Sequence, residues 1–232
     1  MNTDNTLKCV VVGNASVGKT TLMDRLMNDN LAQNAVATIG VDCRLIVFHS
    51  ANSIRVRFWD TAGCERFNAV TRIYYRGVDC ALVCYSDDNE ESLGAVEYWV
   101  NEIRKEHEGI SKKQRKRISE NLCCKGERYV ELPSDEEEYS TFEIPILLVC
   151  TKCDHPLPKS YKKAQGIAEK LHITGPFFTS AHTMTKQQLT LILQPFFKSI
   201  HRSQFGNGRT VASVNLETPT KSSRWHRGNC CV

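Results

Sequence analysis

Residues Gly13-Asn14-Ala15-Ser16-Val17-Gly18-Lys19-Thr20 decide the fold. The segment fits the pattern G-x-x-x-x-G-K-[ST], follows an apolar run over 7–13, and opens a stretch over 19–28 with apolar residues at helical spacing. A strand, a glycine-rich loop and a helix in this order predict a loop whose backbone N–H groups surround phosphates. We expect Lys19 to pair with the β- and γ-phosphates and Thr20 to offer its hydroxyl to Mg²⁺.

Strand and helix patterns alternate along the rest of the chain. Alternating apolar and polar residues over 41–49 and 53–60 predict an antiparallel hairpin. Continuous apolar runs predict parallel strands over 80–86, 144–151 and 177–179. Helical spacing predicts helices over 91–107, 161–171 and 185–199, the last kinked at Pro195. The order predicts an α/β fold: a mostly parallel six-stranded sheet with one antiparallel edge strand, helices on both faces, and ligands at the carboxyl ends of the strands.

Composition and charge limit the class of protein. Hydrophobic residues make up 41% of the 232 residues and charged residues 24%, as in ordinary soluble domains. A net charge of +4 is too small to indicate nucleic-acid binding. We expect one domain over 1–202, with a flexible charged insertion or partner-binding segment over 108–143, and a disordered tail over 203–232. Residues 1–5 lack a basic segment followed by an apolar one, so we expect no secretory signal.

Four more segments lie at predicted strand ends. The first is Thr38-Ile39-Gly40-Val41-Asp42, placed 18 residues after Thr20 and 22 before Asp60. The others are Trp59-Asp60-Thr61-Ala62-Gly63-Cys64-Glu65-Arg66-Phe67, then Thr151-Lys152-Cys153-Asp154, and finally Ser180-Ala181-His182. Together with Tyr74-Tyr75-Arg76-Gly77, they resemble the switch I, switch II, NKxD and SAK motifs of Rab-type small GTPases, with the resemblance covering about 7–107 and 144–200.

The resemblance implies GTP or GDP and Mg²⁺ as cofactors. The implied metal ligands are Thr20, Thr38 and Asp60, the last through water. Asp154 would accept two hydrogen bonds from guanine, which adenine cannot donate, and the Ala181 N–H would meet guanine O6. The implied nucleotide-binding residues are Gly13, Asn14, Ala15, Ser16, Val17, Gly18, Lys19, Thr20, Thr21, Thr38, Asp60, Gly63, Thr151, Lys152, Asp154, Ser180, Ala181 and His182.

Departures from the Rab pattern bear on turnover. Lys19, Gly63 and Cys64 occupy the implied catalytic positions, and Cys64 stands where the family has a water-orienting Gln. A thiol neither donates like an amide NH₂ nor accepts strongly, so we expect slow intrinsic GTP hydrolysis. The methyl group of Ala15 would crowd a partner's arginine finger. Thr151 replaces the family's usual Asn, with some loss of loop bracing expected, and His182 replaces Lys.

The cysteines divide into three groups. Eleven is an odd number, and several lie in apolar strand-like runs, which favours reduced thiols in a reducing compartment. The Cys150-x-x-Cys153 pattern could indicate redox or metal chemistry. No second pair completes a zinc site, and the pattern overlaps the guanine motif, so packed thiols are favoured. Cys230 and Cys231 resemble the doubly geranylgeranylated ends of Rab proteins, whereas Asn229 occupies the position that a C-a-a-X box requires for Cys.

Three functions stay open. The first is a monomeric, membrane-anchored GTP/GDP switch in vesicle trafficking, on the cytoplasmic face of an intracellular membrane and cycling with the cytosol. Its implied partners are an exchange factor, a GTPase-activating protein, effectors at switch I and II, a GDP-dissociation inhibitor and a prenyltransferase escort, with no nucleic acid. The second is a nearly non-hydrolysing GTP-bound scaffold. The third, a P-loop kinase, lacks an arginine-rich lid and is disfavoured by Asp60-Thr61-Ala62-Gly63.

Overall fold

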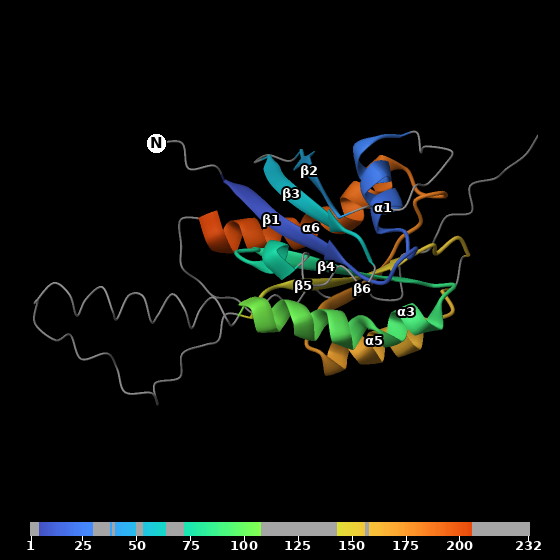
Figure 1. Cartoon of the computed structure of the whole chain (residues 1–232). Coiled ribbons are helices and arrows are strands. Elements are labelled where there is room, and N and C mark those ends of the chain that lie inside the picture. The colour runs from blue at the N-terminus through green and yellow to red at the C-terminus, as the bar shows by residue number, and fades with distance from the viewer. Residues whose placement is uncertain are drawn as a thin grey trace, which may run out of the picture.

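A six-stranded sheet forms the centre of the protein (Figure 1). The computed structural model describes residues 5–29, 38, 40–49, 53–63, 72–107, 143–155 and 158–205. The strands lie in the order β2-β3-β1-β4-β5-β6. Their bounds are β1 Thr6–Val12, β2 Val41–Phe48, β3 Ile54–Thr61, β4 Cys80–Ser86, β5 Ile146–Thr151 and β6 Thr174–Phe178. Only the pair β2 and β3 is antiparallel among these strands, which confirms the predicted α/β sheet with one antiparallel edge strand.

Helices cover both faces of the sheet. Helices α1 (Lys19–Met27) and α6 (Lys186–Phe205) pack on one face, where Leu22 and Phe197 belong to the same buried cluster as β1 and β3. Helix α3 (Glu90–Gly94), the helix over 96–107 and α5 (Tyr161–Lys170) pack on the other. A short 3-10 turn, η2 (Arg72–Tyr75), precedes β4. The apolar strands are therefore buried from both sides, as their continuous apolar runs predict.

The structure corrects three predicted boundaries. The last strand begins at Thr174, three residues before the predicted start, because Gly175 and Pro176 interrupt its apolar pattern on an edge strand that tolerates proline. The helix predicted over 91–107 is interrupted at Ala95, directly after Gly94, a poor helix former. Helix α6 contains Pro195, continues past the predicted end at 199 and crosses the expected domain boundary at 202.

Packing explains why α6 continues through Pro195. Proline removes one backbone hydrogen bond from a helix. The side chains that flank it, Leu193, Phe196, Phe197 and Ile200, are all buried in the core. Burial of this apolar stripe outweighs the lost hydrogen bond, since packing supplies most of the stability of helices in proteins.

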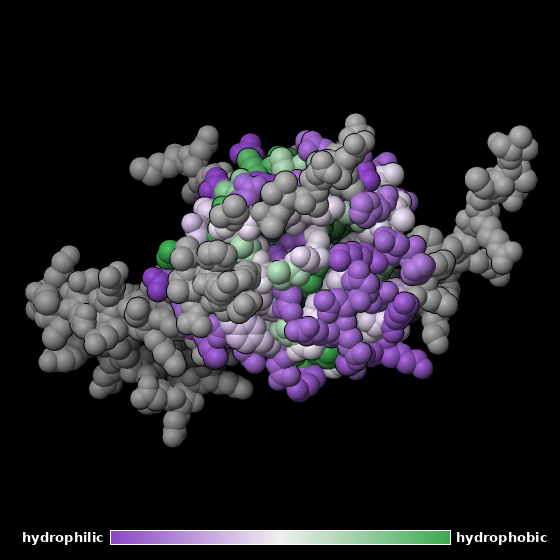
Figure 2. Space-filling view, turned by 45° about the vertical axis from the view of Figure 1, so that its right-hand side comes forward, coloured by the Kyte–Doolittle hydropathy of each residue, from purple (hydrophilic) through white to green (hydrophobic). Residues whose placement is uncertain are grey.

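The carboxyl ends of the parallel strands meet on one side of the sheet. That side lies to the right in Figure 1 and comes forward in Figure 2, where hydrophilic residues cover much of the described surface. Within the described ranges, no helix combines the length and the apolar character needed to cross a membrane. All of the predicted insertion over 108–143 except residue 143, and the tail beyond Phe205, lie outside the described residues.

Candidate functional site

The phosphate loop connects β1 to α1 at the carboxyl end of the sheet. Gly13 has a φ of 142°, and a Cβ there would lie 2.1 Å from the carbonyl oxygen of Cys84, so only glycine fits beside β4. Gly18 has a φ of 96° and forms the N-cap of α1. Ser16 also has a positive φ, of 61°. These conformations turn the chain tightly enough to direct successive backbone N–H groups into one concavity, which is a typical anion site.

Lys19 lies inside this loop. Its Nζ donates hydrogen bonds to the carbonyl oxygens of Gly13 and Asn14, both at 2.9 Å, and the residue is only 5% exposed. Burial lowers the pKa of Lys19, although the nearby Asp60 acts in the opposite direction. The amine is therefore held in the loop by hydrogen bonds to two backbone carbonyls, in a position where an anionic ligand would stabilise its charge.

Three oxygen-bearing side chains meet next to the loop. The Thr20 hydroxyl donates to Asp60 Oδ2 at 2.6 Å and lies 2.6 Å from the Thr38 hydroxyl. Asp60 is fully buried, and its Oδ1 has no hydrogen-bond partner among the described residues. Burial raises the pKa of Asp60, although the hydrogen bond from Thr20 and the charge of Lys19 lower it. A hard divalent cation fits this set, because its oxygen donors and its unpartnered carboxylate oxygen are what Mg²⁺ prefers.

The end of β3 approaches the phosphate loop closely. The Ala62 N–H donates to the Gly40 carbonyl at 2.9 Å, so the two predicted switch segments are joined at their bases. A Cβ on Gly63 would lie 2.4 Å from the carbonyl carbon and oxygen of Asn14, so this approach also requires glycine. Cys64 lies outside the described residues.

A hollow of about 380 Å³ opens beside Gly63. The residues that line it are Asn14, Ala15, Gly63, Asn89, Glu91, Tyr98 and Trp99. The Trp99 indole N–H donates to the Asn14 side-chain oxygen at 2.8 Å, which ties the phosphate loop to the helix over 96–107. Ala15 therefore faces a space large enough for a partner's side chain.

A second hollow, of about 150 Å³, collects the residues of the predicted guanine motifs. It is lined by Gly18, Thr21, Leu22, Thr151, Lys152, Asp154, Thr179, Ala181 and His182. Ser180 donates to Asp154 Oδ1 at 2.5 Å and accepts from the Thr183 N–H at 3.0 Å, so the carboxylate has a fixed orientation. The Arg25 side chain donates to the Ala181 carbonyl at 2.6 Å, which holds the loop after β6 against α1.

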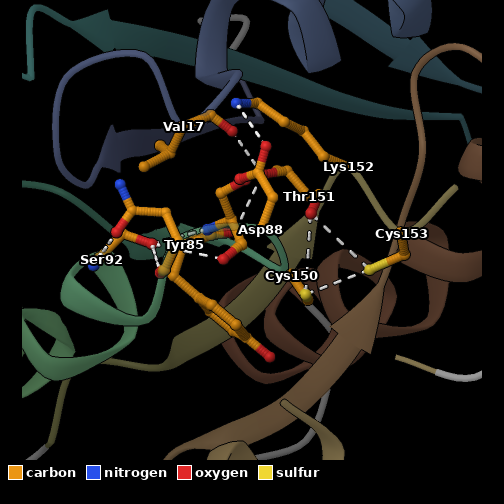
Figure 3. A network of polar contacts seen from close by, with 10 residues as sticks. Val17, Tyr85, Asp88, Ser92, Cys150, Thr151, Lys152 and Cys153 are labelled. Carbon is orange, nitrogen blue, oxygen red and sulfur yellow. Dashed lines mark hydrogen bonds and ion pairs between the residues drawn. The ribbon is translucent and has the colours of Figure 1, made fainter. Parts of the chain in front are cut away.

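Thr151 connects the hollow that contains Asp154 to the phosphate loop and to β4 (Figure 3). Its buried hydroxyl contacts the Val17 carbonyl of the phosphate loop and lies 2.9 Å from the Tyr85 carbonyl at the end of β4. Sequence reasoning expected weaker bracing from this Thr than from the usual Asn, and that comparison stays a prediction. The hydroxyl does reach both neighbouring elements. Lys152 follows with a φ of 56° and forms an ion pair with Asp88 at 3.4 Å.

Sequence reasoning missed Arg25 and Trp99. Arg25 lies in the last turn of α1, where a basic residue has an ordinary helical explanation. Trp99 belongs to an amphipathic pattern typical of any packed helix. No motif distinguishes either residue, and their partners, Ala181 and Asn14, are distant in sequence.

Comparison with known proteins identifies the family. A sequence model of the Ras family matches residues 8–123, which is half of the chain. The chain belongs to the Ras family. Its members are small GTPases that bind guanine nucleotides and hydrolyse GTP.

Rab proteins are among its relatives. Over 104 residues, or 44% of this chain, it is 38% identical to Ras-related protein Rab-3C of Bos taurus, covering 46% of that protein. It is 36% identical to Rab-3 of Caenorhabditis elegans and to Rab-3B of Homo sapiens, covering 48% of each. The chain therefore spans about half the length of the curated relatives it matches, and it is Rab-related within the Ras family.

Proposed function

We propose that this Rab-related chain is a guanine-nucleotide switch that recruits effectors when GTP is bound. The observation that carries the proposal is that one short segment, from Gly18 to Thr21, contributes residues both to the candidate base subsite and to the candidate phosphate subsite. Gly18 and Thr21 line the hollow that contains Asp154, while the residues between them, Lys19 and Thr20, contact the phosphate loop and Asp60. A nucleotide whose base lies against Asp154 would thus have its phosphates over the N-terminus of α1.

Guanine selection would rest on Asp154. The Ser180 hydroxyl occupies one side of Asp154 Oδ1, which leaves the carboxylate to accept hydrogen bonds from guanine N1 and N2. Two hydrogen bonds to a charged acceptor correspond to about a hundredfold or more in affinity.

The test of guanine selection is Asp154→Asn, measured by equilibrium binding of GTP and xanthosine triphosphate. We expect GTP affinity to fall by about a hundredfold and preference to move to xanthosine triphosphate, because the amide donates where the carboxylate accepts. Asp88→Asn is the matched control, since Asp88 pairs with Lys152 but does not line the hollow. GTP affinity unchanged in Asp154→Asn would remove this residue from its role.

Thr20, Thr38 and Asp60 would hold Mg²⁺. The Thr20 hydroxyl lies within hydrogen-bonding distance of both Thr38 and Asp60, and Asp60 Oδ1 is the buried atom that needs a partner. A bound Mg²⁺ would neutralise charge on the β- and γ-phosphates. Thr38 would couple nucleotide state to the effector-facing segment, because its hydroxyl is brought to the site only when that segment closes.

Hydrolysis would be slow because of Cys64. Lys19 and the loop N–H groups would position the phosphates, and Gly63, the residue before Cys64, lies against Asn14 and Ala15 of the phosphate loop. A thiol at position 64 orients water poorly, so the GTP state would be long-lived until a partner supplies the missing groups. A nearly non-hydrolysing scaffold is the second candidate, and the same residue favours it.

Single-turnover GTP hydrolysis of the wild type, Cys64→Gln and Cys64→Ala, each with and without a Rab-activating domain, separates these candidates. We expect Cys64→Gln to exceed the wild type, and Cys64→Ala to match the wild type because the thiol contributes nothing. A partner-driven switch predicts acceleration of the wild type by about 10³ or more. If the activating domain accelerates GTP hydrolysis by Cys64→Gln but not by the wild type, the scaffold is favoured. Equal rates for the wild type and Cys64→Gln in both conditions would contradict the role assigned to position 64.

Membrane attachment through geranylgeranyl groups on Cys230 and Cys231 completes the proposal. Two lipid chains meet the requirement for stable anchoring, and the tail together with Arg202 carries a net charge of +4 that attracts an anionic leaflet. The proposed location is the cytoplasmic face of an intracellular membrane, in vesicle trafficking. An exchange factor, an activating protein, a GDP-dissociation inhibitor and a prenyltransferase escort are the partners that this cycle requires.

A further inference from the structure

The two thiols of the Cys150-x-x-Cys153 pattern face each other in the buried core, and their neighbours in sequence, Thr151, Lys152 and Asp154, line the hollow of the predicted guanine motifs. Their sulfur atoms lie 3.1 Å apart, and both cysteines are unbridged (Figure 3). Cys150 is the penultimate residue of β5, and Cys153 is held by a hydrogen bond from its N–H to the Thr179 carbonyl at 3.0 Å. Closing a disulfide bond, whose S–S length is about 2.05 Å, would move the sulfur atoms by only about 1 Å.

The surroundings make the two thiols unequal. Cys153 donates its S–H to the Cys150 sulfur, which lowers the pKa of Cys150 and raises that of Cys153. The Ser160 hydroxyl lies 3.8 Å from the same Cys150 sulfur and is itself bonded to Asp87. A thiolate at Cys150 is thus favoured over one at Cys153. Cys150 is fully buried, so a small oxidant would reach its sulfur past Cys153, which keeps 8% of its surface exposed.

We propose that Cys150 and Cys153 are a redox-active dithiol, which a hydroperoxide converts to a disulfide, and that the disulfide weakens nucleotide binding. The Cys150 thiolate attacks one peroxide oxygen, and the O–O bond breaks to give a sulfenic acid and an alcohol, or water from hydrogen peroxide. The Cys153 sulfur then displaces hydroxide from the sulfenic sulfur, and the hydroxide leaves as water with the Cys153 thiol proton. Two thiols lose two electrons, and the peroxide gains them.

The effect on the nucleotide rests on the proposed function and follows from chain connectivity. Cys153 lies between Lys152 and Asp154, and Cys150 immediately precedes Thr151. Drawing the sulfurs together displaces the segment that carries Asp154, whose position depends on a 2.5 Å hydrogen bond from Ser180. A carboxylate shifted by a substantial part of 1 Å loses at least one charge-assisted hydrogen bond to guanine, or about tenfold in affinity.

Peptide mapping tests the disulfide directly. Trypsin cleaves after Lys152, between the two cysteines, so Cys150 lies in the peptide over 129–152 and Cys153 in the peptide over 153–159. The full-length GDP-loaded protein is treated with hydrogen peroxide, alkylated and digested without reductant. We expect mass spectrometry to find these two peptides joined, and separated again by dithiothreitol. Two alkylated, unjoined peptides at peroxide doses that already oxidise the exposed Cys43 would overturn the proposal.

Release of a fluorescent GDP analogue tests the consequence. We expect the oxidised wild type to release it about tenfold faster than the reduced protein, with reversal by dithiothreitol. Cys153→Ser should abolish the effect, and Cys43→Ser, at an exposed cysteine in β2, should leave it intact. Equal release rates from the oxidised and the reduced wild type would overturn the proposal that the disulfide weakens nucleotide binding. A reduced protein that binds no guanine nucleotide, yet forms the disulfide, would refute the proposed function and leave the dithiol standing.

Discussion

Replacement of Thr151 by Val tests whether one hydroxyl holds the phosphate loop and the base loop together. The Thr151 side chain is 4% exposed, and its hydroxyl reaches the carbonyl oxygens of Val17 and Tyr85. Valine has nearly the same shape, so the change removes a donor without opening a cavity. Leaving a buried carbonyl without its donor costs about 1–3 kcal/mol. We expect the free energy of unfolding to fall by that amount.

Two assays measure this effect. Urea unfolding at fixed GDP and Mg²⁺ concentrations should show a lower midpoint with an unchanged m-value. GDP dissociation should accelerate by about tenfold, because the phosphate loop loses its contact to Thr151 and a loss of about 1.4 kcal/mol corresponds to a factor of ten. Thr190→Val in α6 is the matched control, since its hydroxyl donates only to the Lys186 carbonyl within the same helix. A Thr151→Val protein with the midpoint and GDP dissociation rate of the wild type would refute the reasoning.

Two further predictions concern the metal subsite and the end of β3. Burial raises the pKa of Asp60 above its ordinary value of 3.8. Without metal, the folded protein therefore holds the Asp60 proton more tightly than the unfolded chain does, and this contribution to the free energy of unfolding is lost as the pH rises through the raised pKa. In EDTA, the free energy of unfolding of Asp60→Asn should therefore rise relative to that of the wild type as the pH rises. Curves of unfolding free energy against pH that run parallel for the two proteins would contradict this. Gly63→Ala puts a Cβ 2.4 Å from Asn14 backbone atoms, and overpacking costs about 1–3 kcal/mol. By isothermal titration, we expect the affinity for a non-hydrolysable GTP analogue to fall by about tenfold relative to the affinity for GDP. An unchanged ratio of these two affinities would show that the contact between Gly63 and Asn14 is not part of the GTP-bound state.

Local patterns predicted the elements because each carries its own periodicity. The pattern around Gly13 and Lys19 predicted the strand, the loop and α1, since a turn with positive φ beside a neighbouring strand requires glycine at fixed positions. Long-range partners carry no such signal. Arg25 bonds to a residue 156 positions away, and Thr151 to one 134 positions away. These contacts exist only after the sheet brings separate strand ends together, so no single segment encodes them.

The departures from the Rab pattern act on different steps of the proposed cycle. Thr151 stands where the Rab pattern has Asn, and its buried hydroxyl contacts the phosphate loop, so we expect this substitution to keep the proposed base and phosphate subsites connected. Thr20 and Asp60 keep the oxygen set that fits Mg²⁺. Cys64 alters only the residue that would position water. We therefore predict that nucleotide affinity and GTP lifetime are separable in this chain: substitutions at Thr151 should change GDP release without restoring hydrolysis, and Cys64→Gln should do the reverse.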